Sequence, residues 1–196
     1  LMPPGTKHGG FGDMAPRVTS HSVRQLVNVL ASGAGNNHWK WYAGQQGAED
    51  PPTYAGFFAA AEAHELRPVP PTELPTSALF EGAGIAALNT DLVSADRNVQ
   101  ILFKSSKFGT ISHGYNAQNG FQLNGGGKPL LQPTGDRDVY GSPHHTKWMW
   151  RAQSQNVILV NGKSFTSNRN AAVGRITHFR TSDAVDVVAG EAGDAY

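Results

Sequence analysis

The sequence predicts an α+β fold in which a short helical segment precedes an antiparallel β-sandwich. Apolar residues recur at helical spacing near the N-terminus, whereas the second half of the chain alternates short apolar runs with turn residues. The stretch Arg67-Pro-Val-Pro-Pro-Thr-Glu-Leu-Pro75 separates the two patterns. Prolines at this density cannot continue a helix and are typical of an extended linker. We therefore expect a helical part at residues 1–75 and a β-sandwich at residues 76–196, with a sandwich that is incomplete.

Two helices are expected before the linker. The first runs from Thr19 to Ser32 and stops at Gly33, because Val23, Leu26, Val27 and Leu30 fall on one helical face. The second, Tyr54 to Leu66, is rich in alanine and ends where the prolines begin. Between them, Asn36 to Tyr42 contains three aromatic residues, which either pack in the interior or line a sugar-binding cleft. The candidates for the N-cap of the first helix are Thr19, Ser20 and Ser22.

Eight short strands are expected after the linker. Asn124-Gly-Gly-Gly-Lys128 and Asn161-Gly162 are turn signals, because glycine and asparagine tolerate the positive φ that tight hairpins require. Regularly spaced strands without intervening helices indicate an antiparallel sandwich. The expected strands are Gly84 to Asn89, Val99 to Lys104, Phe121 to Asn124, Pro129 to Gln132, Lys147 to Gln153, Val157 to Val160, Ala172 to Phe179 and Val185 to Val188.

Composition excludes several classes of function. The formal net charge is +1 and only 16% of the residues are charged, so the dense basic stripe of a nucleic-acid-binding protein is missing. No apolar run approaches the roughly 18 residues of a membrane span. The chain has no cysteine, which rules out disulfides, thiol catalysis and cysteine-ligated zinc. Gly9-Gly-Phe-Gly12 lacks the strand-turn-helix frame of a phosphate loop.

The segment from Phe108 to Phe121 is the strongest candidate for a functional site. Between two expected strands it gathers a histidine, a tyrosine, two asparagines and a glutamine. Such polar groups fit a site better than a core, because buried polar groups are costly unless they are hydrogen-bonded. The polar side chains in question are His113, Tyr115, Asn116, Gln118 and Asn119.

Four motifs carry a family resemblance. Ser112-His-Gly-Tyr-Asn-Ala-Gln-Asn-Gly-Phe121 is followed in order by Pro129-Leu-Leu131, Tyr140-Gly-Ser-Pro-His-His145 and Ser154-Gln-Asn-Val-Ile-Leu-Val-Asn-Gly162. Between about Leu74 and Phe165, the chain resembles the heparinase II/III-like polysaccharide lyases. That resemblance implies an incomplete α/α toroid followed by an antiparallel sandwich, with the active site between them. On this basis we expect a fragment that holds the last toroid helices and the start of the sandwich.

The resemblance implies β-elimination at a uronic acid. His113 matches the active-site histidine that this family carries on the sandwich, and is the expected catalytic residue. Gln118 and Asn119 match the family's Gln-Asn pair, which either contacts sugar or caps the turn into Phe121. The family's catalytic tyrosine is expected upstream, in the rest of the lyase chain, and Tyr115 is only a weak local substitute.

Further sugar contacts are expected from Tyr115, Asn116, Arg137 and His145. Arg137 either pairs with a sugar carboxylate or sulfate, or forms a local ion pair with the aspartates beside it. His145 follows another histidine, and adjacent residues of an extended segment point to opposite sides, so at most one of the two faces the cleft.

The departures from the family pattern concern zinc. Many members hold zinc with two histidines and an aspartate, and the corresponding positions here are Tyr115, Pro133 and Gln155. Tetrahedral zinc requires His, Cys or carboxylate ligands, so we expect no metal and no other cofactor.

The expected function is cleavage of an anionic, uronate-containing polysaccharide such as alginate, ulvan or a glycosaminoglycan. Since such polymers lie outside the cytoplasm, a periplasmic or secreted location is expected, although the N-terminal residues have no signal-peptide pattern. The alternative is a carbohydrate-binding or structural sandwich without turnover. A glycoside hydrolase needs two opposed carboxylates, and no such pair is evident.

Overall fold

A computed structural model describes residues 2–7, 10–12, 21–45, 66–107, 113–115, 117–134, 137–165 and 170–196. Its helices α1 and α2 precede all of its strands, and short 3-10 or π-helical turns connect several strands. The elements are α1 (His21–Ala34), α2 (Asn37–Gly44), β1 (Ala78–Phe80), β2 (Ile85–Asn89), η1 (Ala95–Arg97), β3 (Val99–Lys104), β4 (Gly120–Gly125), β5 (Lys128–Leu131), η2 (His145–Met149), η3 (Ala152–Ser154), β6 (Arg175–Arg180), β7 (Val187–Glu191) and η4 (Gly193–Ala195).

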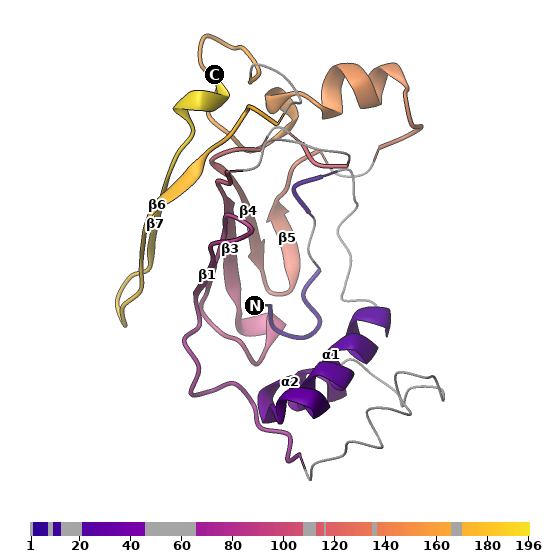
Figure 1. The fold of residues 1–196 in the computed structure, drawn as a ribbon, viewed down its shortest axis with the longest axis vertical. Helices are drawn as coiled ribbons and strands as arrows, with labels where there is room; N and C mark the ends of the chain where they lie inside the picture. The colour runs from indigo at the N-terminus through magenta and orange to yellow at the C-terminus, as the bar shows by residue number, and fades with distance from the viewer. Residues whose placement is uncertain are drawn as a thin grey trace.

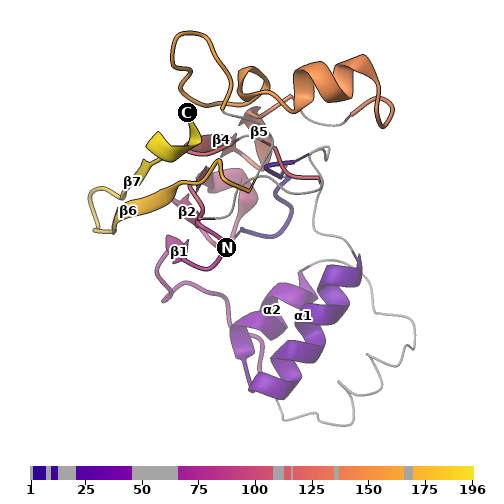
Figure 2. The same cartoon turned by 45° about the horizontal axis from the view of Figure 1, so that its top comes forward.

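The strands form one five-stranded sheet in the order β1-β2-β3-β4-β5 and a separate hairpin, β6-β7. All of the pairings are antiparallel. In Figures 1 and 2 the hairpin lies beside the sheet, and the two helices lie at one end of it. The α+β fold class with a sandwich-like part is therefore confirmed.

The two helices pack against each other as an antiparallel pair (Figure 2). The first helix is confirmed, but α1 continues past Gly33 and ends at Ala34, where Gly35 takes a φ of +62°. Asn36 then caps α2 by accepting the Trp39 N–H at 2.9 Å. The helix expected at 54–66 lies outside the described residues, except for Leu66. No helix within the described ranges is long and apolar enough to cross a membrane.

One face of the five-stranded sheet is buried and polar. Asn89, Gln100 and Asn124 stand opposite one another on β2, β3 and β4. Gln100 Nε2 donates to Asn89 Oδ1 at 2.8 Å, and Asn124 Nδ2 donates to Gln100 Oε1 at 2.9 Å. Gln132 extends the row by donating to Asn124 Oδ1 at 3.1 Å. Because a buried amide is costly unless it is paired, this ladder fixes the register of four neighbouring segments.

The opposite face of the sheet is apolar. Leu88, Ile101 and Leu123 form a row across β2, β3 and β4, and Phe103 lies beside Phe121 in the next row. The β6-β7 hairpin covers part of this face, and a hollow of about 900 Å³ separates the turn at 181–186 from the linker and from β2 and β3. The hairpin thus takes the position of the second layer of a sandwich.

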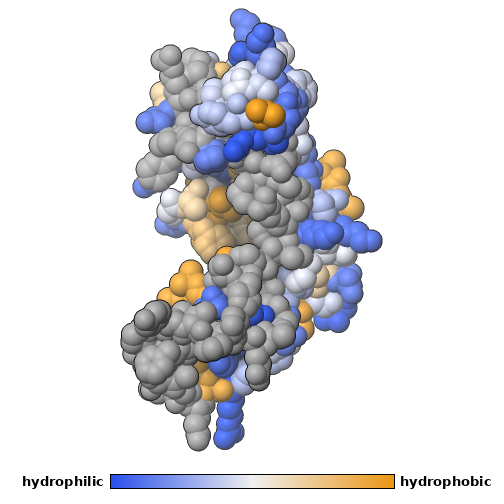
Figure 3. Space-filling model, turned by 90° about the vertical axis from the view of Figure 1, so that its right-hand side faces the viewer, coloured by the Kyte–Doolittle hydropathy of each residue, from blue (hydrophilic) through white to orange (hydrophobic). Residues whose placement is uncertain are grey.

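A second hollow, of about 420 Å³, lies between the helices, the linker and the connection from β2 to β3. It is lined mainly by apolar and aromatic side chains of α1, α2 and the linker, including Leu30, Trp39, Trp41, Tyr42 and Leu74. On the side of the molecule drawn in Figure 3, apolar surface is exposed in the hollow between the lower and upper parts. The aromatic run after Asn36 is therefore helical and partly solvent-facing, a structure that the sequence analysis did not predict.

Two of the expected strands are wrong. The segment 147–153 is helical in η2 and η3 instead of extended. Ser142 accounts for the difference: its Oγ accepts the His145 N–H at 3.0 Å, and Pro143 follows it directly, which together are signals of a helix start. The segment 157–160 contains only an isolated bridge between Val160 and Lys163. The turn there is as expected, since Asn161 and Gly162 both have positive φ.

The other expected strands are present with shifted ends. β2, β3, β4 and β5 match within about one residue. β6 begins only at Arg175 and β7 extends to Glu191. The turn at 124–128 is confirmed, with Gly126 and Gly127 both at positive φ. Strand β1 was not expected, because its three residues carry too little apolar alternation to indicate a strand.

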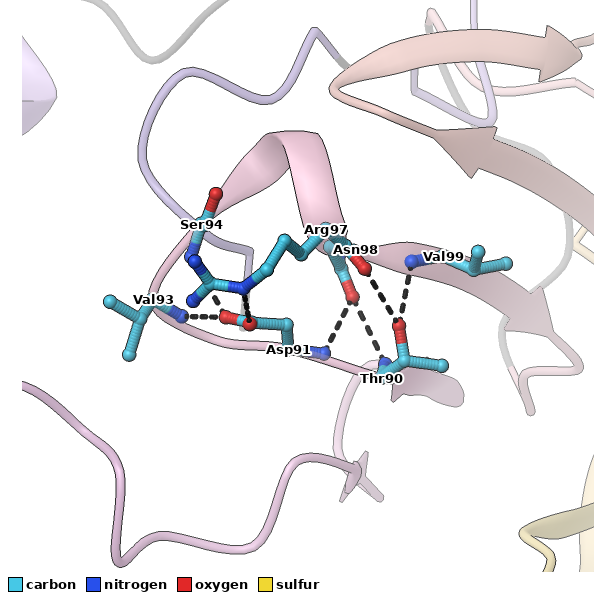
Figure 4. Close-up of polar contacts among 7 residues, drawn as sticks. All are labelled: Thr90, Asp91, Val93, Ser94, Arg97, Asn98 and Val99. Atoms are coloured by element: carbon cyan, nitrogen blue, oxygen red, sulfur yellow. Dashed lines mark hydrogen bonds and ion pairs between the residues drawn. The ribbon is translucent and has the colours of Figure 1, made fainter.

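The connection between β2 and β3 is held by a carboxylate (Figure 4). Asp91 Oδ1 accepts the N–H groups of Val93 at 2.6 Å and Ser94 at 2.8 Å, and Oδ2 pairs with Arg97 Nε at 2.8 Å. Asn98 Oδ1 accepts the Asp91 N–H at 3.0 Å, which joins this loop to the buried amides. The backbone hydrogen bond from Ser94, more than any other contact, lowers the pKa of Asp91 below its ordinary value.

We expect Asp91→Ala to lower the free energy of unfolding by about 1.5 kcal/mol near neutral pH, because hydrogen bonds to a charged acceptor are lost. Denaturant titration measures the difference, and Asp96→Ala, an exposed neighbour in η1, is the matched control. Since folding lowers the pKa of Asp91, its contribution is present above the unfolded pKa of about 3.9 and is lost as the pH falls through the lower folded value. A gap between wild type and variant that stays constant on acidification would contradict this account.

Candidate functional site

His113 lies in the connection between β3 and β4, at the end of the sheet opposite the Asp91 loop. Its side chain is exposed, and its Nδ1 atom lies 3.3 Å from Nη1 of Arg137. Arg137 belongs to a separate loop that leads from β5 to η2. The structure therefore joins two residues that the sequence analysis named independently, over 24 positions of the chain.

Arg137 also contacts an aromatic residue that the sequence analysis did not single out. Its guanidinium carbon lies 5.6 Å from the centre of the Tyr140 ring, which is within cation–π range. Tyr140 is 73% exposed, and its ring centre lies 5.1 Å from that of His145. The side chains of His113, Arg137 and Tyr140 thus form a continuous row, which we call the 113–140 row. No sequence spacing in an irregular loop predicts such a row.

His145 lies beneath this row and is only 2% exposed. The Gly141 N–H points at its Nδ1 at 2.9 Å, and the Trp150 indole N–H points at its Nε2 at 3.1 Å. Burial first, and then the charge of Arg137, lowers the pKa of His145. In this position His145 supports Tyr140 from below; the expected sugar contact stays a prediction that its burial does not favour.

Asp138 stabilises the same loop. Its Oδ1 accepts the Ser142 hydroxyl at 2.6 Å and lies 3.4 Å from His144 Nδ1. The Ser142 hydrogen bond is the main cause that lowers the pKa of the Asp138 carboxyl. The expected alternative, a local ion pair of Arg137 with its neighbouring aspartates, concerns Asp138 and Asp136, and Asp136 lies outside the described residues.

A close backbone approach places His113. Residues Gly12 and Gly114 form an antiparallel bridge, and the Tyr115 N–H donates to the Phe11 carbonyl at 3.1 Å. A Cβ atom at position 12 would overlap the carbonyl oxygen of His113. Only glycine fits at this contact. Gly12, in the glycine-rich segment that does not fit a phosphate loop, therefore helps to position the loop that carries His113.

Gln118 is buried, and its carboxamide binds the backbone of two other segments. Its Oε1 accepts the Ser106 N–H at 2.8 Å, and its Nε2 donates to the carbonyls of Ser106 at 3.0 Å and Ala172 at 2.9 Å. Asn119 takes a φ of +54° in the turn before β4, and its Nδ2 donates to the Gly190 carbonyl at 3.1 Å. Both side chains therefore hold the sheet, the loop and the β6-β7 hairpin together. Asn116 lies outside the described residues.

The three positions that correspond to the family's zinc ligands converge in a buried cluster. The Tyr115 hydroxyl contacts Met149 Sδ at 3.7 Å, and the Ser154 hydroxyl donates to the Met149 carbonyl at 3.0 Å. Gln155 donates to Ser154 Oγ at 2.8 Å, and Pro133 is buried directly before Thr134, whose N–H donates to the Ser154 carbonyl at 3.0 Å. A phenol, a proline and a carboxamide do not fit a tetrahedral zinc ion. Among the described residues, no group of three or more His, Cys, Asp or Glu side chains is placed to hold a metal.

Lys104 is a further titratable group near the end of β3. Its side chain is half-buried, and burial lowers its pKa to about 8. From the sequence, Lys104 was expected only as the last residue of a strand. Its perturbed pKa was not visible in the sequence because burial of the strand end depends on the tertiary fold.

Comparisons with known proteins support the fold. No family model and no curated protein matches the sequence. Solved structures do match: heparan sulfate lyase HepC from Pedobacter heparinus has a TM-score of 0.68 at 13% identity, over 100% of this chain and 27% of that one. Two structures of heparinase III have TM-scores of 0.67 and 0.61 at 13% identity, over 100% and 96% of this chain and 26% and 28% of theirs. The chain thus spans about a quarter of their length, and the expected resemblance is confirmed for the fold.

We expect the free energy of unfolding to fall as the pH drops through about 6.5, because the unfolded chain takes up the His145 proton before the folded chain does. Folding lowers this pKa, so His145 favours the folded state less at acidic pH. The free energy of unfolding of His145→Gln should depend less steeply on pH, whatever the overall stability of the variant. His178 is exposed on β6, so His178→Gln should leave the pH dependence unchanged. Equal slopes for wild type and His145→Gln, measured by denaturant titration across this range, would contradict the prediction.

We expect the purified protein to carry no stoichiometric zinc at the cluster of Tyr115, Pro133 and Gln155, since none of these residues is a usual zinc ligand. Elemental analysis after exposure to zinc and dialysis checks this expectation. One zinc per chain in wild type that is lost in a Tyr115→Phe, Gln155→Leu double variant would show that the cluster binds the metal after all.

Proposed function

We propose that this chain supplies the sandwich side of the active site of a polysaccharide lyase. The substrate is an anionic, uronate-containing polysaccharide, which is cleaved by β-elimination. The observation that carries the proposal is the pair of His113 and Arg137, in a chain whose fold matches part of a heparan sulfate lyase. An extended, anionic polymer requires a solvent-accessible cation, and the half-buried Arg137 of this pair provides one.

The reaction determines what the pair must do. Removal of the C5 proton of a uronate places negative charge on the C6 carboxylate, and donors aimed at that carboxylate lower the barrier. The electron pair of the C5–H bond then forms the C4=C5 double bond, the C4–O bond breaks, and the departing oxygen takes a proton. A planar guanidinium binds a carboxylate through two parallel hydrogen bonds. We assign the carboxylate-binding role to Arg137 and His113.

The other candidates have supporting parts in this proposal. Tyr140 presents a flat, exposed face beside Arg137, which suits stacking on a sugar ring. Gln118, Asn119 and Tyr115 position the loop from within the protein. Asn116 is retained as a sugar contact because of its place in the motif. The base that takes the C5 proton is assigned to no described residue, and the upstream tyrosine expected from the resemblance remains the proposed candidate.

The proposed substrates lie outside the cytoplasm, so the proposal includes a periplasmic or secreted location. Alginate, ulvan and glycosaminoglycans all contain uronates and are the substrates to be tried. The partner of this chain is accordingly an anionic polysaccharide, together with the toroid residues that complete the site.

The test incubates the complete protein with these polysaccharides and follows the ultraviolet absorbance of the unsaturated uronate product. We expect wild type to give product and His113→Ala to lower its rate of formation by about 100-fold or more, as for loss of a donor to a developing oxyanion. Arg137→Ala should act in the same direction. His178→Ala is the matched control, because His178 is exposed on β6, away from the 113–140 row.

The outcomes separate the candidate functions. An undiminished rate in His113→Ala would remove this residue from the site. Binding of several polysaccharides by wild type, without product from any of them, would favour the carbohydrate-binding module over the lyase.

A further inference from the structure

We propose that Arg137, besides its proposed contact with the substrate carboxylate, fixes the neutral imidazole of His113 in one tautomer, with its proton on Nε2. The inference concerns the chemical state of the ring, which neither the motif nor the fold specifies. It starts from the 3.3 Å contact between Arg137 Nη1 and His113 Nδ1.

The direction of this hydrogen bond follows from the chemistry of the two groups. A guanidinium carries only N–H donors and keeps its proton throughout the accessible pH range. The atom that faces it must therefore be an acceptor. In a neutral imidazole one nitrogen accepts and the other carries the proton, so contact at Nδ1 places the proton of His113 on Nε2.

The guanidinium is held in place from its other side. Its carbon lies over the Tyr140 ring at 5.6 Å, and Tyr140 is backed by the His145 ring at 5.1 Å. His145 is buried, with the Gly141 N–H and the Trp150 indole N–H beside its two nitrogens, only one of which can accept in a neutral ring. The packing of Tyr140 and His145 therefore restricts the position of the Arg137 side chain beside His113.

Asp138, the described carboxylate adjacent to Arg137 in sequence, is engaged by Ser142 and by His144. A carboxylate at Nδ1 of His113 would select the opposite tautomer, because it can only accept. The guanidinium occupies that position instead.

The tautomer determines what His113 offers to a substrate, a consequence that rests on the proposed function. With its proton on Nε2, the ring presents an N–H donor, which suits binding of the C6 carboxylate. The lone pair that a base would use lies on Nδ1 and is engaged by Arg137. His113 thus stabilises the charge that develops, and a different residue takes the C5 proton.

The experiment determines the tautomer of His113 by NMR and does not depend on lyase activity. Protein labelled with ¹⁵N at histidine is studied by long-range ¹⁵N–¹H correlation at about pH 8.5, where an ordinary imidazole is neutral. The chain has eight histidines, and the signals that disappear in His113→Gln identify the ring of interest. We expect wild type to show His113 as a single tautomer with a protonated Nε2 and an unprotonated Nδ1.

Arg137→Gln should convert His113 to a mixture of both tautomers. Arg180→Gln, which removes an exposed arginine at the end of β6, should leave the spectrum of His113 unchanged. Arg137→Lys is a second variant, which keeps a cation but lacks the planar guanidinium. Unchanged signals from the other histidines show that each variant keeps its fold. A proton on Nδ1 in wild type, or a tautomer that is the same in wild type, Arg137→Gln and Arg137→Lys, would overturn the proposal. Absence of lyase activity, in contrast, would overturn only the proposed function.

Discussion

The carboxamide of Gln118 is the interaction on which the arrangement of this chain depends most. It forms hydrogen bonds with the backbone N–H and carbonyl of Ser106, just after β3, and with the carbonyl of Ala172, before β6. Without it, the Ser106 N–H and the Ala172 carbonyl would lose this partner, and each buried group that stays unpaired costs about 1–3 kcal/mol. One side chain thereby joins the five-stranded sheet to the β6-β7 hairpin and closes the loop that carries His113.

The candidate site is built outward from this closed loop. The bridge between Gly12 and Gly114 sets the backbone of His113 from one side. From the other side, buried His145 supports Tyr140, which in turn lies against Arg137. The candidate side chains at the surface are thus supported by buried polar contacts, which would organise the proposed site before a ligand binds. Such preorganisation is what stabilisation of a developing charge requires.

Much of the fold was accessible from local sequence signals. Apolar alternation and paired glycines predicted β3, β4 and the turn between β4 and β5, since their geometry is set by near neighbours. The segment 147–153 misled the same reasoning, because Trp148 and Trp150 alternate with Met149 as a strand would. The cap at Ser142 and the burial of His145 select a helical turn there, and burial is not a local property.

The sequence by itself determined the order of a helical part and a sandwich-like part, and it named His113, Arg137 and His145 as separate candidates. Only the tertiary structure decided that Arg137 contacts His113, that His145 lies below the surface, and that Tyr140 lies between Arg137 and His145. It also turned Gln118 and Asn119 inward, toward backbone groups of distant segments. The physical reason is that residue type limits the chemistry of a side chain, whereas its partners, exposure and protonation follow from contacts between segments far apart in the chain.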